Sequence, residues 1–420
     1  MNFLNKLFQK SKNLNYISLK FKELNQRTEV KKIFNAIRDF SENSEVRYVG
    51  GCVRKIINRE SIDDIDLATN ITPEELMTVL DKNDIKFYET GIEHGTVTAI
   101  IDNIKFEITS LRKDIKTDGR HAKVEYSQDW HEDASRRDFS INSIYSDIEG
   151  NLFDPFNGKK KIEDGVVEFI GEEEKRIKED YLRILRYVRF FLNYSKVGHS
   201  SSTIKAIKKN LSGMSKISSE RLLDEFKKLS RSEGFLKLGK DKFCLEIIIL
   251  IFPQFKQINI IKNITKKNIR NLDFIILISL LINDGSDNIE YFFYRFNISN
   301  NDKKRILFLK NFFSSKTNKK TFSRANLWKE FYLNGKQTLF DLLNYQILKS
   351  YNSYKELFDE IEFFKDKKCP TMPVNANFLM EHYNFEEGKE LGVKLKKIEE
   401  KWLNNNFKIS ENEIKKLLLS

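Results

Sequence analysis

Apolar residues follow two different spacings along this chain. Up to about Glu172, short segments with strand-like alternation, such as residues 96–101 and 104–110, occur among segments with helical spacing, such as residues 28–40. From Glu172 onward the apolar residues recur at helical spacing and no convincing strand follows. The pattern therefore predicts a mixed α/β head and an all-α remainder.

Turn and capping residues add detail to the head. Asp102 and Asn103 separate two strands of an expected hairpin, and Thr72 is expected to cap a helix that starts at Pro73. Further strands are expected at residues 47–49 and 62–67, and residues 152–158 are expected to form a strand that ends in a turn. The polar residues 112–131 are expected to form a loop, and residues 135–145 a helix.

Composition limits the class of protein. The chain has 420 residues, enough for two or more compact units, and its longest apolar runs, 245–252 and 274–282, are far too short to span a membrane. The net charge of +12 suggests a polyanionic partner. An AT-rich genome, which favours Asn, Lys, Ile and Phe, explains the same charge equally well.

Three scattered cysteines, Cys52, Cys244 and Cys369, form neither a disulfide framework nor a zinc-binding spacing. We therefore expect a reducing cytoplasm, with no disulfide partner and no membrane. Residues 1–22 are basic and lack acidic residues, as in a transit peptide, but lysine takes the place of the usual arginine. We expect an N-terminal extension instead.

The first candidate site combines two glycines with two aspartates. Asp64 and Asp66 fall in a predicted strand, whose period of two places both carboxylates on one face. Two such close carboxylates repel each other unless a cation lies between them, and Mg²⁺ prefers oxygen ligands. Gly50 and Gly51 can bring backbone N–H groups close to a phosphate. These are the parts of a nucleotidyl-transfer site.

The second candidate site lies in residues 179–190. Asp180, Arg183, Arg186 and Arg189 are spaced by three and are expected to share one helix face, with apolar residues on the other. Three arginines on one face suit a triphosphate. A salt-bridged solvent face is the alternative interpretation.

The ordered motifs resemble a known family. Gly50 to Asp66, Arg136 to Asn142 and Glu179 to Arg183 are similar to the class II tRNA nucleotidyltransferases, the bacterial-type CCA-adding enzymes, and to the related bacterial poly(A) polymerases. The motifs cover residues 47–230, and a weaker similarity continues from Asn377 to Trp402.

The resemblance implies an α+β head with the DNA polymerase beta-like nucleotidyltransferase fold and a mixed sheet, followed by an all-α neck, body and tail. The implied domains are an N-terminal extension (1–27), the nucleotidyltransferase head (28–160), a neck with the nucleotide-binding helix (161–232), a tRNA-binding body (233–365) and a tail (366–420).

The resemblance also implies residue roles. Asp64 and Asp66 would hold catalytic Mg²⁺, and Glu107 is either a third catalytic carboxylate or a structural or solvated residue. The residues implied to contact the nucleotide are Gly50, Gly51, Arg54, Arg137, Asp180, Arg183, Arg186 and Arg189. Two positions depart from the family pattern: Lys55 replaces the usual Asp, and Tyr181 replaces the usual Pro.

Asp180 and Arg183 are expected to select the incoming base. C and A both present an exocyclic amine beside a ring nitrogen, so a carboxylate can accept from the amine while a guanidinium donates to the nitrogen. U and G present a carbonyl beside a ring N–H, which leaves both protein groups badly paired.

The implied reaction is template-independent addition of CCA to the 3′ end of tRNA from CTP and ATP, with release of pyrophosphate by two-metal chemistry. The polar residues 116–121 resemble a flexible loop that members adding only CC shorten. A poly(A) polymerase and an A-adding specialist are the alternatives, although residues 90–96 lack the Gly-Arg-Arg-Phe-type segment of the former. A noncatalytic RNA-binding relative is the alternative of another class.

Overall fold

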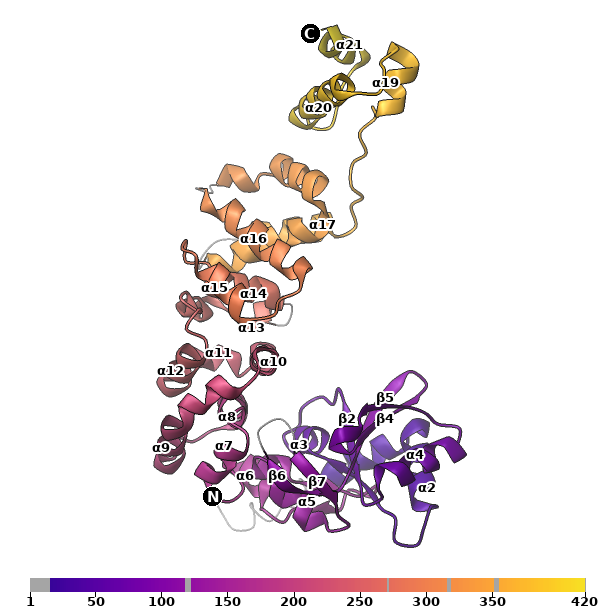
Figure 1. Cartoon of the computed structure of the whole chain (residues 1–420), viewed down its shortest axis with the longest axis vertical. Helices are drawn as coiled ribbons and strands as arrows, with labels where there is room; N and C mark the ends of the chain where they lie inside the picture. The colour runs from indigo at the N-terminus through magenta and orange to yellow at the C-terminus, as the bar shows by residue number, and fades with distance from the viewer. Residues whose placement is uncertain (1–15, 118–121, 270–271, 316–318, 351–354, 420) are drawn as a thin grey trace. The chain divides into compact units, whose positions relative to one another are not determined.

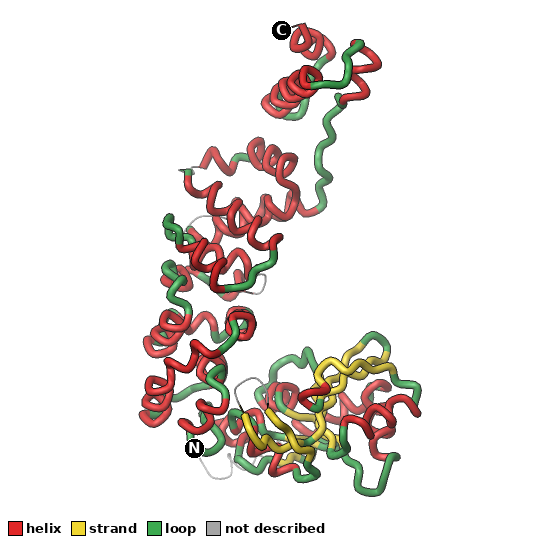
Figure 2. Tube along the Cα trace, in the orientation of Figure 1, coloured by secondary structure: helices red, strands yellow, loops and turns green. Residues whose placement is uncertain are grey.

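The computed structural model describes residues 16–117, 122–269, 272–315, 319–350 and 355–419. The chain divides into two compact units, Met1–Ile251 and Phe252–Ser420. Among the described residues, every strand belongs to the first unit, and the second is built from helices (Figure 2). The predicted α+β head and helical remainder are thus confirmed, while the five-part division into domains stays a prediction.

The head is built on a seven-stranded mixed sheet with the order β3-β4-β5-β2-β1-β8-β9. Figure 1 labels β2, β4 and β5 of this sheet. Strands β2 and β5 pair in parallel, and the other neighbours pair antiparallel. The strands are β1 (Val46–Val49), β2 (Ile65–Thr69), β3 (Lys86–Gly91), β4 (Thr96–Ile101), β5 (Ile104–Ser110), β8 (Tyr145–Ser146) and β9 (Leu152–Phe153). A separate two-stranded sheet joins β6 (Arg112–Thr117) to β7 (Ala122–Tyr126).

Helices pack on one face of this sheet because its strands alternate. In β5, Phe106 and Ile108 are buried while Glu107 between them is exposed, so one face is covered and the other carries polar side chains. Helix α2 contacts β1, α3 contacts β1 and β2, and α4 contacts β3 and β4. The helices of the first unit are α2 (Thr28–Arg38), α3 (Gly51–Ile57), α4 (Pro73–Lys82), α5 (Trp130–Arg136), α6 (Gly158–Asp164), α7 (Glu173–Glu179), α8 (Arg183–Tyr194), α9 (Ser201–Asn210), α10 (Ser219–Ser230), α11 (Phe235–Leu238) and α12 (Lys242–Ile251), with a further helix at residues 16–25 and short 3₁₀ turns at Ile92–His94, Ser140–Asn142 and Leu211–Lys216.

Several local predictions are confirmed. The β4–β5 hairpin spans the residues expected for it. Thr72 caps α4 through a capping box, in which its side chain accepts from the backbone of Glu75 and the Glu75 carboxylate accepts from the backbone of Thr72.

Two expected elements are wrong. Residues 112–131 contain the β6–β7 hairpin. The sequence of β6 is largely polar, and the short alternation of Ala122, Val124 and Tyr126 in β7 was overlooked beside it. Residues 135–145 are not one helix: α5 ends at Arg136, and Phe139 is extended where it packs on Phe169 and Phe190, with ring centroids 4.8 and 5.3 Å away. Burial of this ring overrides the helical pattern. The loop residues 118–121 lie outside the described residues.

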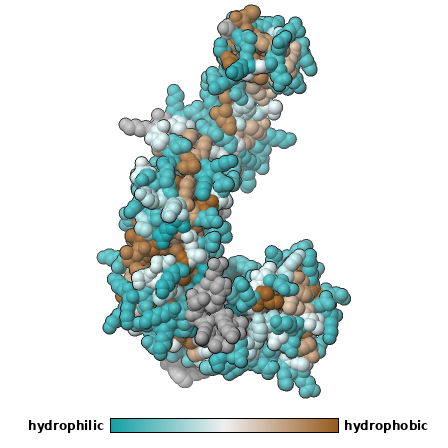
Figure 3. Space-filling view, in the orientation of Figure 1, coloured by the Kyte–Doolittle hydropathy of each residue, from teal (hydrophilic) through white to brown (hydrophobic). Residues whose placement is uncertain are grey.

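The second unit consists of α13 (Lys266–Ile269), α14 (Phe274–Ile282), α15 (Asn288–Arg295), α16 (Asn300–Ser314), α17 (Arg324–Lys349), α18 (Lys355–Lys365), α19 (Ala376–Tyr383), α20 (Lys389–Asn404) and α21 (Glu411–Leu419), with 3₁₀ turns at Ile258–Asn263 and Lys319–Phe322. Its last three helices enclose a small apolar cluster centred on Leu379, Leu391 and Ile398. None of the described helices is both long and apolar enough to cross a membrane. The face drawn in Figure 3 is largely hydrophilic, with scattered apolar patches.

Candidate active site

A cavity of about 620 Å³ opens between the head sheet and the helices that follow it in the first unit. Its size is that of an ordinary ligand pocket, but its lining is polar where such pockets are usually apolar. Among the described residues, eight arginines line it: Arg54, Arg112, Arg136, Arg137, Arg183, Arg186, Arg189 and Arg221. Of the carboxylates in the described part of the chain, four do so, namely Asp66, Asp138, Glu179 and Asp180. The excess of positive charge predicts an anionic ligand.

Two glycines bring the start of α3 against this lining. Gly50 has φ +65°, and a Cβ added there would lie 3.6 Å from Nη1 of Arg137. A Cβ on Gly51 would lie 3.3 Å from Oδ2 of Asp66. Both predicted glycines therefore line the cavity, and side chains here would crowd its charged groups.

The three predicted carboxylates lie near one another at the edge of the sheet. Asp66 is half-buried and lies in register with Glu107 of the parallel neighbour β5, which is exposed. Asp64 is exposed and precedes β2 by one residue, so the prediction that both aspartates lie within the strand is wrong. Asp66 lines the cavity, whereas Asp64 and Glu107 are not among the lining residues.

The electrostatics of Asp66 fit a cation. Burial raises its pKa, and the negative charges of Glu107 and Asp64 raise it further, against the opposing effect of Arg137 and Arg54. The carboxylates thus repel one another, and an oxygen-coordinated divalent ion would relieve that repulsion.

A buried aspartate holds two of the cavity arginines. Asp133 of α5 is 1 % exposed and accepts from Arg136 at 2.6 Å, from Arg137 at 3.1 Å and from the Tyr145 hydroxyl at 2.5 Å. Burial alone would raise the pKa of Asp133, but the two arginines and the hydroxyl hold it well below its ordinary value. The carboxylate therefore stays charged and fixes both guanidinium groups.

A second buried aspartate joins the head to α8. Asp138 accepts from Nε of Arg186 at 2.6 Å and from the Asn142 amide at 2.9 Å. Although burial opposes ionisation, Arg186 and Asn142 lower the pKa of Asp138 to about 2. The Asn142 oxygen in turn accepts from Arg54, whose guanidinium lies over the ring of Phe190 at 4.9 Å.

Helix α8 contributes the remaining predicted arginines. Arg183 donates to Glu179 at 2.6 Å, and Arg189 donates to Glu225 of α10, which is 2 % exposed. The spacing predicted that Asp180 shares a helix with Arg183, and this prediction is wrong. Asp180 is extended, and its carboxylate accepts a hydrogen bond from the N–H of Leu182 just before α8 begins. Its other oxygen accepts from Arg221 at 2.7 Å.

The cavity thus gathers all eight residues predicted to contact a nucleotide: Gly50, Gly51, Arg54, Arg137, Asp180, Arg183, Arg186 and Arg189. Sequence reasoning missed the groups that hold them, chiefly Asp133, Tyr145 and Arg176. Arg176 donates to the backbone oxygens of Arg136 and Arg137. Arg176 lies 40 and 39 residues from these partners, so a single sequence does not reveal the contact. Asp133 precedes Arg136 and Arg137 by three and four residues, and this helical spacing was the available signal for it.

Comparison with known proteins places this site in a family. The family model of the Poly A polymerase head domain matches residues 46–168. The chain is 32% identical over 386 residues to "CCA tRNA nucleotidyltransferase 1, mitochondrial" of Mus musculus, an alignment that covers 89% of this chain and 86% of the mouse protein. The chain belongs to the CCA tRNA nucleotidyltransferase family.

Two further comparisons agree with this membership of the CCA tRNA nucleotidyltransferase family. The human protein of the same name is 45% identical over 191 residues, which cover 45% of this chain and 44% of the human protein. The crystal structure of the Bacillus stearothermophilus CCA-adding enzyme in complex with CTP is similar in fold, with a TM-score of 0.71 at 20% identity over 94% of this chain and 98% of that chain. The predicted family and fold are confirmed.

The Asp133 network gives a stability prediction. Asp133→Asn should lower the free energy of unfolding by about 3–5 kcal/mol, because it leaves Arg136 and Arg137 without their buried carboxylate. Urea unfolding measures this loss. The exposed pair Asp224–Lys228, at 61% and 54% exposure, supplies the control: Asp224→Asn should cost less than about 1 kcal/mol.

The difference in free energy of unfolding between wild type and Asp133→Asn should depend on pH in a definite direction. The pKa of Asp133 is lower in the folded than in the unfolded chain, so its stabilisation is present above about pH 4 and is lost as the pH falls further. The difference between wild type and Asp133→Asn should therefore shrink in acid. A difference that is constant with pH, or no larger than that of Asp224→Asn, would contradict the assignment.

Proposed function

We propose that the chain adds CCA to the 3′ end of tRNA from CTP and ATP, without a nucleic-acid template and with release of pyrophosphate. The observation that carries the proposal is the arginine-lined cavity with the Asp66 carboxylate in its wall, in a member of the CCA tRNA nucleotidyltransferase family. A nucleoside triphosphate brings the negative charge that such a lining lacks.

The phosphates would lie against the arginines. Arg137, Arg186 and Arg189 are each held by a buried carboxylate, so their orientation is set before a ligand arrives. Arg54 and the two glycines would border the same phosphates. Preorganised donors of this kind lose little freedom on binding.

The carboxylates would hold the divalent ion. Asp64 and Asp66 are the proposed Mg²⁺ ligands, and Glu107, in register with Asp66, is placed to be a third carboxylate. When bound there, Mg²⁺ would supply positive charge next to the attacking 3′-hydroxyl and the leaving pyrophosphate. The mutual repulsion of these carboxylates supports a cation at this edge.

The base would be read by Asp180 and Arg183. Each already has a protein partner, yet each keeps hydrogen-bonding capacity, because a carboxylate oxygen has two lone pairs and a guanidinium has five N–H groups. Arg221 and Glu179 thus orient the pair without saturating it. C and A match the pattern this pair offers, whereas U and G do not.

We propose a reducing compartment, with the cytoplasm as first choice, because Cys52 and Cys244 are buried free thiols. The mouse relative is named mitochondrial, and residues 1–22 are basic. The distribution of a C-terminally tagged chain between cytosol and mitochondria distinguishes the two.

Substitution of three neighbouring aspartates by asparagine tests the proposed metal ligands. Asp66→Asn and Asp64→Asn should each reduce incorporation of labelled CTP at least about a hundredfold while leaving tRNA binding largely unchanged. Asp63→Asn is the matched control, since Asp63 is 70% exposed and pairs with Lys55. Near-wild-type incorporation by Asp66→Asn, or an equal loss in Asp63→Asn, would overturn the metal assignment.

Base selection is tested at Arg183. Arg183→Ala should reduce the preference for CTP and ATP over UTP and GTP roughly tenfold or more, because the ring nitrogen loses its donor. The ratio of incorporation efficiencies for the four nucleotides measures this, with Arg231→Ala, an exposed arginine at the end of α10, as control. An equal loss of rate for all four nucleotides would contradict this role and show that Arg183 makes only a structural contact.

Binding of tRNA should weaken steeply with salt. If lysines and arginines neutralise about six phosphates, the logarithm of the association constant should fall with a slope of about −4 to −5 against the logarithm of salt concentration. Filter binding at several salt concentrations measures the slope. A flat response would show that the charge of +12 reflects composition and not tRNA contact.

A further inference from the structure

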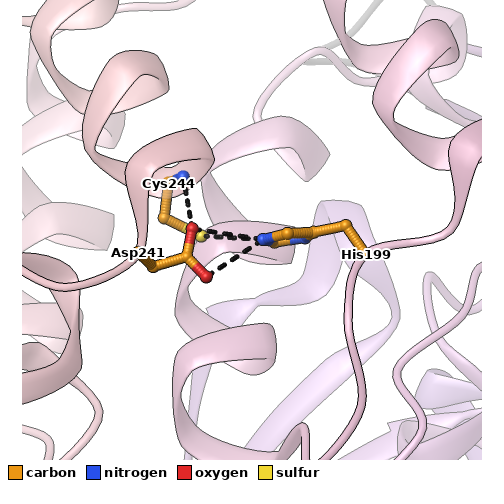
Figure 4. A group of neighbouring side chains, drawn as sticks. All are labelled: His199, Asp241 and Cys244. Atoms are coloured by element: carbon orange, nitrogen blue, oxygen red, sulfur yellow. Dashed lines mark hydrogen bonds and ion pairs between the residues drawn. The ribbon is translucent and has the colours of Figure 1, made fainter.

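Three side chains of different chemistry, His199, Asp241 and Cys244, point toward one another in the helical part of the first unit (Figure 4). His199 lies between α8 and α9, Asp241 directly precedes α12, and Cys244 lies in the first turn of α12. Their nearest ligand atoms all lie within 4.8 Å of one another, and among the described residues no other such His, Cys, Asp or Glu group of three or more is found. None of the three lines the cavity.

The hydrogen bonds around His199 are not those of a nucleophile and its base. In such an arrangement the carboxylate and the nucleophile contact opposite nitrogens of the imidazole ring. Here both approach Nε2: the Asp241 oxygens lie 3.1 and 3.2 Å from it, and the Cys244 sulfur lies 3.9 Å from it. Nδ1 instead lies 2.9 Å from the hydroxyl of Tyr187. Three donor atoms therefore converge on one point.

Convergence on one point is the arrangement of a metal site. In a tetrahedral zinc site, nitrogen, oxygen and sulfur ligands lie about 3.3–3.6 Å from one another, given their usual bond lengths. The separations here, 3.1 and 3.9 Å, bracket those values. A mixed imidazole, carboxylate and thiolate set suits Zn²⁺ and not Mg²⁺, which prefers oxygen.

The surroundings hold these ligands in place. The His199 ring stacks on Phe191, with centroids 3.6 Å apart, and meets the edge of Phe243. Metal-binding histidines usually have a hydrogen-bond partner on the other ring nitrogen, and the buried Tyr187 hydroxyl is such a partner. Cys244 is fully buried, whereas Asp241 is 23% exposed, so an ion can reach the cluster from solvent on the Asp241 side.

We propose that His199 Nε2, Asp241 and the Cys244 thiolate bind a zinc-type divalent cation, which ties the segment before α9 to the start of α12. On binding, the Cys244 thiol would release its proton to solvent, and the N–H of Nδ1 would donate to the Tyr187 oxygen. Because Tyr187 and Phe191 belong to α8, the ion would brace this helix from behind while Arg186 and Arg189 face the cavity. Its role would be structural and independent of the proposed transfer reaction.

Co²⁺ titration of the metal-stripped full-length chain tests the site, because a cobalt–thiolate bond gives a charge-transfer absorption that oxygen sites lack. Excess Mg²⁺ keeps the carboxylates near Asp66 occupied. We expect one Co²⁺ per chain with this absorption, its loss in Cys244→Ser, and its retention in Cys369→Ser, which removes an exposed thiol. Zn²⁺ should displace the Co²⁺ and raise the thermal unfolding midpoint of wild type but not of Cys244→Ser.

Tyr187→Phe keeps the ring and removes only the outer hydrogen bond, so it should weaken Co²⁺ binding about 10–100-fold. Absence of thiolate absorption in wild type would overturn the proposal and leave an ion pair between His199 and Asp241. The same absorption in a folded Cys244→Ser would also overturn it. If Cys244→Ser does not fold, the wild-type spectrum and Tyr187→Phe still decide.

Discussion

The structure of this site depends on one electrostatic constraint: eight arginines must face a single cavity without driving the head and the neck helices apart. Three carboxylates that are nearly inaccessible to solvent, Asp133, Asp138 and Glu225, pair with four of these arginines, namely Arg136, Arg137, Arg186 and Arg189. Glu179 and Asp180 pair with Arg183 and Arg221. The positive charge is therefore locally compensated but still available to a ligand.

Two of these carboxylates, Asp138 and Glu225, join elements that are distant along the chain. Asp138 follows α5 in the head and binds Arg186 of α8, and Glu225 of α10 binds Arg189 of the same helix. Arg176 of α7 completes the junction by donating to two backbone oxygens of the head. Asp138 and Arg176 thus also fix the head against α8. Asp66 lines the same cavity, which therefore carries both signs of charge.

The spacing of apolar residues predicted the helices and strands whose formation depends on local sequence pattern and burial. The amphipathic helix α2, the β4–β5 hairpin and the capped helix α4 were all expected, because each has a strong local signal. The β6–β7 hairpin was not, because β6 is largely polar and the apolar alternation of β7 covers only five residues. The extended conformation of Phe139 depends on the packing of its ring, and that of Asp180 on a hydrogen bond from a backbone N–H to its side chain. The helical spacing of residues carries no information about either contact.

Motifs predicted the arginines that line the cavity but not the residues that hold them. Asp133 could have been expected to pair with Arg136 and Arg137, which follow it by three and four residues. Its hydrogen bond with Tyr145 is recognisable only once the two residues are close in space. The cluster of His199, Asp241 and Cys244 is similar, since 42 residues separate His199 from Asp241 and the three cysteines show no zinc spacing. Long-range partners are the part of such a site that one sequence does not reveal.

The most direct test of the central claim uses three tRNAs: one that lacks the whole CCA end, one that ends in CC and one that ends in CCA. Each is incubated with CTP alone, ATP alone, both, or UTP and GTP. Sequencing of the product ends measures what is added. The account predicts two C residues from CTP on the shortest tRNA, one A from ATP on the tRNA ending in CC, CCA from the mixture, and no extension of complete tRNA. Repeated A addition, A addition alone, or no incorporation would contradict it and favour, respectively, a poly(A) polymerase, an A-adding specialist or a noncatalytic RNA-binding protein.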